Sequence, residues 1–362
     1  MSRFWSPLVH NLTPYVPGEQ PKIERLVKLN TNESPYGPSP KVLAAIASEN
    51  TEQLRLYPDP DASALKQAIA QLHGLDPKQV FVGNGSDEVL AHIFLGLLKH
   101  DQPVLFPDIT YSFYPVYCQL YGIESKTIPL NANFEIHIDD YLKLAKKNGG
   151  IIFPNPNAPT GRALLRAEIE RLIQQNTDSV LVIDEAYVDY GTESCVSLLR
   201  DEAGMAACPN NLLVVHTLSK SRALAGLRVG FALGHPDLIA GLERVKNSFN
   251  SYPLGKLAQA GAIAAIEDQA HLEAMANKVK ATRAGLMDKL NELGFETVPS
   301  SANFIFTRHP KYAGEKIYQA LRERGIIVRH FNKNRIQDHL RITIGNDEQI
   351  KALILALQEL IT

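Results

Sequence analysis

The chain has 362 residues, of which 45% are hydrophobic and 21% are charged, and its formal net charge is −2. This composition is typical of a globular protein with room for two domains and excludes a largely disordered chain. The nearly balanced charge argues against a general nucleic-acid binder, which usually carries a basic excess.

The first thirty residues contain Pro7, Pro14, Pro17 and Pro21 and show no sustained periodicity. We expect residues 1–30 to form an arm that lies against another part of the protein. A loop is predicted from Leu29 to Pro40, followed by a short helix from Lys41 to Ala47.

From about residue 79, short apolar segments alternate with longer amphipathic ones. A helix is predicted after Ser86, which suits the N-cap position, and an aromatic helix is predicted from Tyr111. Short β-branched runs between helices indicate a mostly parallel sheet covered on both faces, and so an α/β domain over 31–255. The predicted strands are 80–82, 104–106, 151–153, 180–183, 212–215 and 229–232.

The remaining residues, 256–362, are predicted to form a smaller α+β domain. A long helical pattern from Leu254 to Leu293 is expected to lead into it from the larger domain. Strands are then predicted at 303–306, 326–328 and 340–344, and helices at 314–324 and 347–361.

The cysteines and the apolar runs bear on the compartment. Three cysteines without a C-x-x-C pair suit a reducing cytoplasm better than a disulfide framework. No apolar run approaches the roughly 18 residues of a membrane-spanning helix, and the first residues lack the apolar core of a signal peptide. The histidines form no H-E-x-x-H motif, so no metal site is expected. We therefore expect a cytoplasmic protein.

Polar residues follow several predicted strands, where ligands of α/β proteins usually bind. The turn Gly83-Asn84-Gly85-Ser86-Asp87 lies between a strand and a helix, whose free N–H groups suit an anion such as phosphate. It is no dinucleotide motif, because Glu88 stands in place of the third glycine. Such a turn is, by itself, most often only a turn.

Three other strand ends carry chemistry-bearing groups. Asp184 ends one strand, Lys220 follows another, and the proline- and asparagine-rich turn 154–161 follows a third. Each feature alone could be structural, as a capping carboxylate or a proline-rich connection. Together they place a lysine, an acid, asparagines and a helix N-terminus at one sheet edge. Pyridoxal 5′-phosphate chemistry needs this set: a lysine for the Schiff base, an acid for the pyridine nitrogen and a cup for the phosphate.

The segment around the lysine resembles a known motif. Thr217-Leu218-Ser219-Lys220, followed by Ala225-Gly226-Leu227-Arg228-Val229-Gly230-Phe231, is similar to the lysine motif of fold-type I pyridoxal-phosphate enzymes. More narrowly, the chain resembles the histidinol-phosphate aminotransferase family over nearly its whole length. The stretches that carry this resemblance are 11–15, 29–33, 56–59, 110–111, 184–187 and 340–345.

The resemblance implies roles for the matching residues. Lys220 is implied to bind the cofactor covalently and to move the substrate's α-proton, Asp184 to pair with the pyridine nitrogen, and Tyr187 to donate to the ring oxygen. Tyr111 is implied to stack on the ring. The implied phosphate ligands are Gly85, Ser86, Asp87, Thr217, Ser219 and Arg228, and the implied substrate ligands are Tyr15, Asn32, Arg329 and Arg341.

Two further implications concern assembly and a departure from the family pattern. Tyr57 is implied to reach the cofactor phosphate of a neighbouring subunit, so a homodimer with shared sites is expected. The family commonly has an asparagine directly before Pro-Thr-Gly, where this chain has Ala158. We expect Asn157, rather than Asn155, to take that asparagine's place beside the ring oxygen.

The implied reaction is transamination between glutamate and imidazole-acetol phosphate, which yields histidinol phosphate in histidine biosynthesis. Alternatives are an aromatic amino-acid aminotransferase, a pyridoxal-phosphate-dependent decarboxylase of a phosphorylated amino acid, and a cofactor-binding protein without activity. Arg341 lies among alternating apolar residues, where a buried arginine requires an anion. A structural salt bridge would also satisfy Arg341, and Arg329 could be a surface residue.

Overall fold

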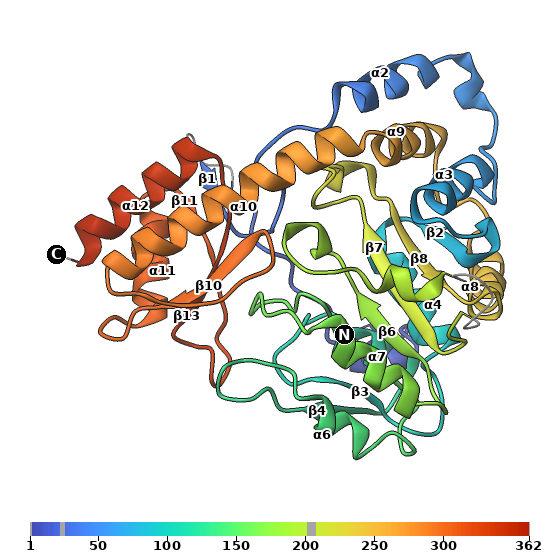
Figure 1. Ribbon diagram of the computed structural model, residues 1–362, viewed down its shortest axis with the longest axis horizontal. Helices are drawn as coiled ribbons and strands as arrows, with labels where there is room; N and C mark the ends of the chain where they lie inside the picture. The colour runs from blue at the N-terminus through green and yellow to red at the C-terminus, as the bar shows by residue number, and fades with distance from the viewer. Residues whose placement is uncertain (1, 22–25, 201–207, 362) are drawn as a thin grey trace.

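The structure is a computed structural model that describes residues 2–21, 26–200 and 208–361. It has a larger part built on one sheet and a smaller part built on another. The long helix α10 (Gln269–Glu292) runs from one part to the other (Figure 1).

The larger part contains a seven-stranded sheet in the order β2-β8-β7-β6-β5-β3-β4. Only β8 runs antiparallel to its neighbours, so the prediction of a mostly parallel α/β sheet is confirmed. The strands are β2 (Val80–Gly83), β3 (Val104–Pro107), β4 (Ser125–Ile128), β5 (Gly150–Pro154), β6 (Leu181–Asp184), β7 (Leu212–Thr217) and β8 (Gly230–Gly234).

Helices cover both faces of this sheet. Successive residues of β5 alternate between two cores: Ile151 and Phe153 pack on one side, and Ile152 packs on the other. The helices are α2 (Pro40–Glu49), α3 (Ser63–His73), α4 (Gly85–Gly96), α5 (Tyr114–Tyr121), α6 (Ile138–Leu142), α7 (Arg166–Gln175), α8 (Pro236–Phe249) and α9 (Lys256–Glu267). Short 3-10 helices lie at Glu52–Arg55, Pro77–Gln79, Val188–Tyr190, Cys195–Leu199 and Ala225–Leu227.

Two local predictions in this part are wrong. Helix α4 begins at Gly85 with Asn84 at the N-cap position, so Ser86 lies inside the helix instead of capping it. The helical pattern from Leu254 to Leu293 forms two helices, because the chain leaves helical geometry at Asp268. The Asp268 carboxylate accepts hydrogen bonds from Ser39 and Lys41, which hold the break against the start of α2.

The smaller part contains a four-stranded antiparallel sheet in the order β12-β13-β10-β9. Its strands are β9 (Glu296–Val298), β10 (Phe304–Arg308), β12 (Arg329–His330) and β13 (His339–Thr343). Helices α10, α11 (Gly314–Glu323) and α12 (Asp347–Ile361) share one apolar core with it. The predicted strand 326–328 is divided, because Ile326–Ile327 form a separate strand, β11, with another partner.

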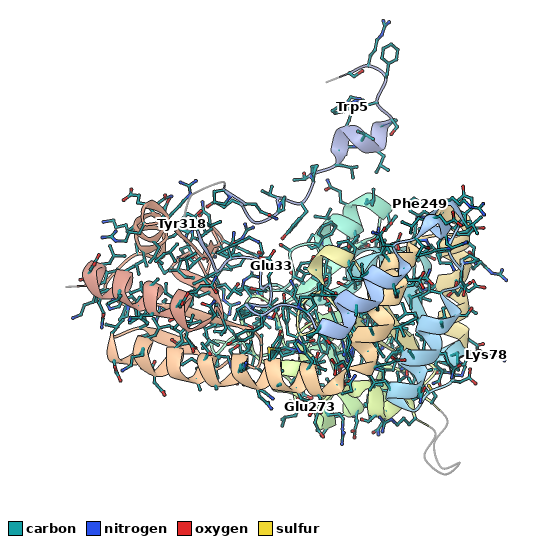
Figure 2. The ribbon with its side chains drawn as sticks, turned by 90° about the horizontal axis from the view of Figure 1, so that it is seen from above. Trp5, Glu33, Lys78, Phe249, Glu273 and Tyr318 are labelled. Atoms are coloured by element: carbon teal, nitrogen blue, oxygen red, sulfur yellow. The ribbon has the colours of Figure 1, made fainter. Side chains whose placement is uncertain are left out.

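That partner comes from the N-terminal segment. Strand β1 (Val27–Lys28) pairs in parallel with β11, and Leu29 is buried in the core of the smaller part. Helix α1 (Pro7–Asn11) and Trp5 project away from the body of the molecule (Figure 2). The chain therefore crosses from an exposed arm to the smaller part before it enters the larger one.

Helix α9 packs against α2 and α3 beside the larger sheet. The exact domain boundaries stay a prediction.

No helix in the described ranges combines the length and the apolar character that crossing a membrane requires.

Candidate active site

A cavity of about 220 Å³ lies at the carboxyl ends of β5, β6 and β7, where β12 and β13 of the smaller part close over it. Most of the predicted site residues line it, although they come from segments far apart in the sequence. These residues are Tyr15, Asn32, Ser86, Asp87, Tyr111, Asp184, Tyr187, Thr217, Ser219, Lys220, Arg228, Arg329 and Arg341.

Lys220 lies in the turn after β7, and its amine reaches across the cavity. Its Nζ donates to the carbonyl oxygen of Thr31 at 3.2 Å and lies 5.9 Å from the centre of the Tyr187 ring. Burial and the positive charge of Arg341 lower the pKa of Lys220 to about 8. About a tenth of this amine is therefore uncharged at pH 7, and the uncharged form is the one that a nucleophile or a general base requires.

Asp184 is the last residue of β6, and its carboxylate is only 5% exposed. Burial raises the pKa of Asp184 to about 6, although hydrogen bonds from the Tyr114 hydroxyl and the Ala186 N–H oppose that shift. The donors lie at 3.1 and 3.2 Å from separate carboxylate oxygens. A cationic group in the cavity beside Asp184 would favour its ionised form.

The first turn of α4 forms one wall of the cavity through Ser86 and Asp87. The glycine at position 230 lets β8 approach this turn closely, because a Cβ there would overlap the backbone nitrogen of Ser86. Gly85 has a φ of +82°, and a Cβ on it would overlap the Arg228 guanidinium. Backbone N–H groups at a helix N-terminus beside a guanidinium suit a phosphate.

Side chains complete this wall. Arg228 donates to Asp87 at 3.0 Å and to the Ser219 hydroxyl at 3.3 Å, and the Thr217 hydroxyl donates to Ser219 at 3.0 Å. Tyr111 donates to the other oxygen of Asp87, also at 3.0 Å. One network therefore fixes a guanidinium, two hydroxyls and an aromatic ring around the end of α4.

The Tyr187 hydroxyl is oriented by Asn32. The Asn32 amide donates to the hydroxyl oxygen at 2.9 Å, so the phenolic hydrogen remains free to be donated into the cavity. The backbone of Asn32 has a φ of 57°, and the Thr343 hydroxyl both accepts from its N–H and donates to its side-chain oxygen. This contact links the smaller part to the centre of the site.

Arg329 and Arg341 lie opposite each other in the register of β12 and β13. Arg341 donates to the Asn30 carbonyl at 2.8 Å, but its buried Nε has no hydrogen-bond partner among the described residues. Burial also lowers the pKa of Arg341. Within those residues no salt bridge satisfies the Arg341 Nε, and Arg329 lines the cavity, so neither structural alternative fits. Two guanidiniums there suit an anionic ligand group.

Three predicted residues do not line the cavity. Gly85 lies behind its wall. Tyr57 is 80% exposed and stacks on Tyr252, with ring centres 4.7 Å apart. The Asn157 amide is already bonded to Ile109 and Thr110, which follow β3, and to Thr160 in its own turn.

This placement does not support the choice of Asn157 as a cofactor ligand. Asn155 is no substitute, because its amide exchanges two hydrogen bonds with the backbone of Leu164. Ala158 lines the cavity at the position where the family commonly has asparagine.

Two ionisable residues at or beside the cavity were not among the predicted site residues. Glu33 lines it and contacts Lys28 and Thr31, whose hydrogen bonds outweigh burial and lower the pKa of Glu33. Tyr114 lies behind Asp184. The segment 29–33 did signal Glu33, whereas Tyr114 is one of several aromatic residues in its helix and has no distinguishing pattern.

A wider cavity of about 760 Å³ lies between the loop around Phe134 and β9 of the smaller part. It contains three arginines, but each one is already paired: Arg162 with Glu135, Arg308 with Glu296 and Arg335 with Asp108. None of the predicted site residues lines this wider cavity. The smaller cavity is therefore the candidate active site.

The fold and the site together define a pyridoxal-phosphate enzyme. Residues 24–357 match the family described as Aminotransferase class I and II, and the chain belongs to this family. It is 60% identical to "Histidinol-phosphate aminotransferase 2" of Dechloromonas aromatica, over 99% of both chains.

Two solved structures show the same fold. Histidinol-phosphate aminotransferase from Sinorhizobium meliloti, in complex with pyridoxal-5′-phosphate, superposes with a TM-score of 0.86 at 25% identity, over 100% of this chain and 98% of that one. L-threonine-O-3-phosphate decarboxylase from Porphyromonas gingivalis superposes with a TM-score of 0.78 at 24% identity, over 93% of this chain and 99% of that one. The fold alone does not separate a transaminase from a decarboxylase.

Members of this family use pyridoxal phosphate, and the residues present fit it. Lys220 offers an amine whose pKa is lowered, and the buried Asp184 favours a cationic partner. Ser86 and Asp87 at the N-terminus of α4, together with Arg228, line the cavity where a phosphate would fit. The chain is a pyridoxal-phosphate-dependent aminotransferase.

Proposed function

We propose that the chain transfers an amino group reversibly between glutamate and imidazole-acetol phosphate, with histidinol phosphate as the product. The structural observation that carries this proposal is the pair of arginines that line the cavity. The buried Nε of Arg341 has no partner in the part of the chain that the structure describes. The name of the relative that is 60% identical over 99% of the chain supports the same substrate.

The reacting centre lies around Lys220. When bound, pyridoxal phosphate supplies an aldehyde carbon for the amino group and a ring that withdraws electrons from the substrate's α-carbon. Lys220 holds the cofactor and then moves a proton to and from that α-carbon, because its amine is partly uncharged at neutral pH. Asp184 would face the ring nitrogen, and Tyr187 would donate its free phenolic hydrogen to the ring oxygen.

The other cavity residues hold the two anionic ends. The residues that would hold the cofactor phosphate are Ser86, Asp87, Thr217, Ser219 and Arg228, and Tyr111 would lie against the ring. Arg329, Arg341 and the Tyr15 hydroxyl bind the substrate's anion, while Asn32 orients Tyr187. A guanidinium fork matches both a carboxylate and a phosphate, so the same clamp serves glutamate and the phosphorylated substrate.

Glutamate is thus one of two substrates, and an aromatic amino acid could use the same clamp through its carboxylate. The test is a comparison of kcat/KM for histidinol phosphate, phenylalanine and tyrosine, with 2-oxoglutarate as the acceptor. Histidinol phosphate should be preferred by at least about tenfold, since its phosphate accepts more hydrogen bonds than a carboxylate. Equal or better use of phenylalanine would replace this proposal with an aromatic amino-acid aminotransferase.

We also propose that the active unit is a homodimer in the cytoplasm. Tyr57 is 80% exposed and lies outside the cavity of its own chain, and the arm exposes Phe4 and Trp5. Aromatic side chains are enriched at protein interfaces, so these exposed rings suit contact with a second copy of the chain. Three cysteines free of disulfide bonds suit a reducing compartment.

A further inference from the structure

We propose that Tyr114 is a positioning residue that keeps the Asp184 carboxylate ionised and turned toward the ring nitrogen of the cofactor. This inference rests on the proposed role of Asp184 as the partner of that nitrogen. Tyr114 itself touches neither cofactor nor substrate, because Asp184 lines the cavity and Tyr114 does not.

The two donors to Asp184 come from outside the cavity. The Tyr114 hydroxyl lies 3.1 Å from Oδ2, and the backbone N–H of Ala186 lies 3.2 Å from Oδ1. Each carboxylate oxygen therefore has one donor behind it and retains a lone pair for a donor in the cavity. Two fixed donors also prevent the carboxylate from turning away from its position at the end of β6.

The hydroxyl of Tyr114 is held in place by its surroundings. Tyr114 is the first residue of α5 and is 0% exposed. Its ring packs against Phe94, Phe106 and Tyr111, with ring centres 5.6 to 5.9 Å apart. Tyr111 lines the cavity and meets the Tyr114 ring at 89°, so the same tyrosine supports two walls of the site.

The hydrogen bond opposes the effect of burial on Asp184. Burial favours the protonated acid, and the negative charge of Asp87 acts in the same direction. The Tyr114 hydroxyl, the Ala186 N–H and His216 favour the carboxylate. A hydroxyl that donates to a carboxylate forms a charge-assisted bond, which is stronger than a neutral one. Without it, Asp184 would more often carry a proton and hold a protonated ring nitrogen less well.

The test compares two probes that differ at one atom. Apoenzyme is titrated with pyridoxal phosphate and with its carbocyclic analogue, in which a C–H group replaces the ring nitrogen, and both dissociation constants are measured by equilibrium dialysis. The wild type should bind pyridoxal phosphate more tightly than the analogue. Tyr114→Phe should reduce this preference by about tenfold, the effect of one hydrogen bond to a charged group, and leave the analogue's affinity unchanged.

The matched control is Tyr141→Phe in the same part of the protein. Tyr141 is also buried, but its hydroxyl has no hydrogen-bond partner among the described residues. This change should leave the preference intact. Should Tyr114→Phe not fold, Tyr114→His gives the same comparison, because its shorter ring cannot bring a donor to Asp184, and an undiminished preference there would overturn the proposal.

Asp184→Asn distinguishes the role of Asp184 as partner of the ring nitrogen from the role of Tyr114 as its positioning residue. If it abolishes the preference and Tyr114→Phe does not, the role of Asp184 stands and the role of Tyr114 is overturned. If Tyr114→Phe weakens both probes equally, Tyr114 is only a core residue, and the proposal is again overturned. If Asp184→Asn itself keeps the full preference, Asp184 does not face the ring nitrogen, and both assignments are overturned.

Discussion

Burial in the same cavity shifts the pKa values of Lys220 and Asp184 in opposite directions. Burial lowers the pKa of Lys220 to about 8 and raises the pKa of Asp184 to about 6. Paired groups whose pKa values are moved in this way commonly divide acid and base roles in an active site. Both pKa shifts come mainly from the removal of water, which disfavours the charged form of each side chain. A ligand group of opposite charge would therefore stabilise that charged form.

The lowered pKa of Lys220 predicts how apoenzyme takes up pyridoxal phosphate. Only the uncharged amine is nucleophilic, so the rate of covalent attachment should rise with pH, with a midpoint near 8. Arg341→Met removes the second cause of the shift, a neighbouring positive charge, and should move the midpoint upward. Stopped-flow absorbance gives both profiles, and a wild-type midpoint near the ordinary lysine value would show that the amine is not desolvated.

Asp184→Asn should separate catalysis from stability. The native pKa of about 6 exceeds the ordinary value of 3.8, so native protein binds more protons between these values. The unfolding free energy contributed by Asp184 therefore falls as pH rises through that window. In Asp184→Asn apoenzyme this fall should disappear, while kcat of the loaded enzyme drops roughly hundredfold or more. Denaturant titrations at several pH values test stability, and an unchanged kcat would leave Asp184 a structural acid.

The residues of the site were predictable where a strand end marks them. Lys220, Asp184 and Arg341 follow or interrupt buried apolar runs, and all three line the cavity. The side-chain direction of Asn157 was not predictable, since its amide bonds to Ile109 and Thr110 in a distant segment as well as to Thr160 in its own turn, and no pattern reveals those bonds.

At the scale of elements, the phosphate wall depends on how closely β8 approaches α4. Gly230→Ala would place a Cβ on the backbone nitrogen of Ser86, so the strand and the helix must separate. We expect a loss of about 1–3 kcal/mol in unfolding free energy, as for overpacked cores, together with weaker binding of pyridoxal phosphate. Urea unfolding and cofactor titration measure the two effects.

Gly226→Ala is the control for that variant. Gly226 lies in the preceding 3-10 helix, and a Cβ there has no heavy atom within 4 Å among the described residues. Its stability and cofactor affinity should match the wild type. Equal behaviour of the two variants would show that the wall tolerates a wider gap.

The helices and strands that were predicted are those with runs of buried apolar residues. Those that depend on contacts with distant segments of the chain were missed. The inner strands are buried on both faces, so their apolar runs identify them. Strand β4 was missed, because three of its four residues are exposed and only Ile128 is buried. The break at Asp268 depends on Ser39 and Lys41, more than two hundred residues away, while the alanine-rich pattern continues across it.

For the whole molecule, we expect active sites that are each built from residues of two chains. A Lys220→Ala chain and a Tyr57→Phe chain should each be nearly inactive alone. After subunit exchange, half of the dimers are hybrids with one intact site each, so about a quarter of wild-type activity should return. Mixing two batches of the same variant is the control. If exchange is demonstrated and no activity returns, Tyr57 acts within its own chain or not at all.

We infer that this cavity holds pyridoxal phosphate bound to Lys220. Borohydride trapping tests this attachment. Reduction of the active holoenzyme makes the bond between lysine and cofactor permanent, and digestion followed by mass spectrometry locates the labelled lysine. The added pyridoxyl mass should be found on the peptide that contains Lys220 and should be absent from Lys220→Ala. Exposed Lys78 should remain unlabelled, because it lies far from Glu33, a residue that lines the cavity (Figure 2). A label on any other lysine of active enzyme would contradict the account.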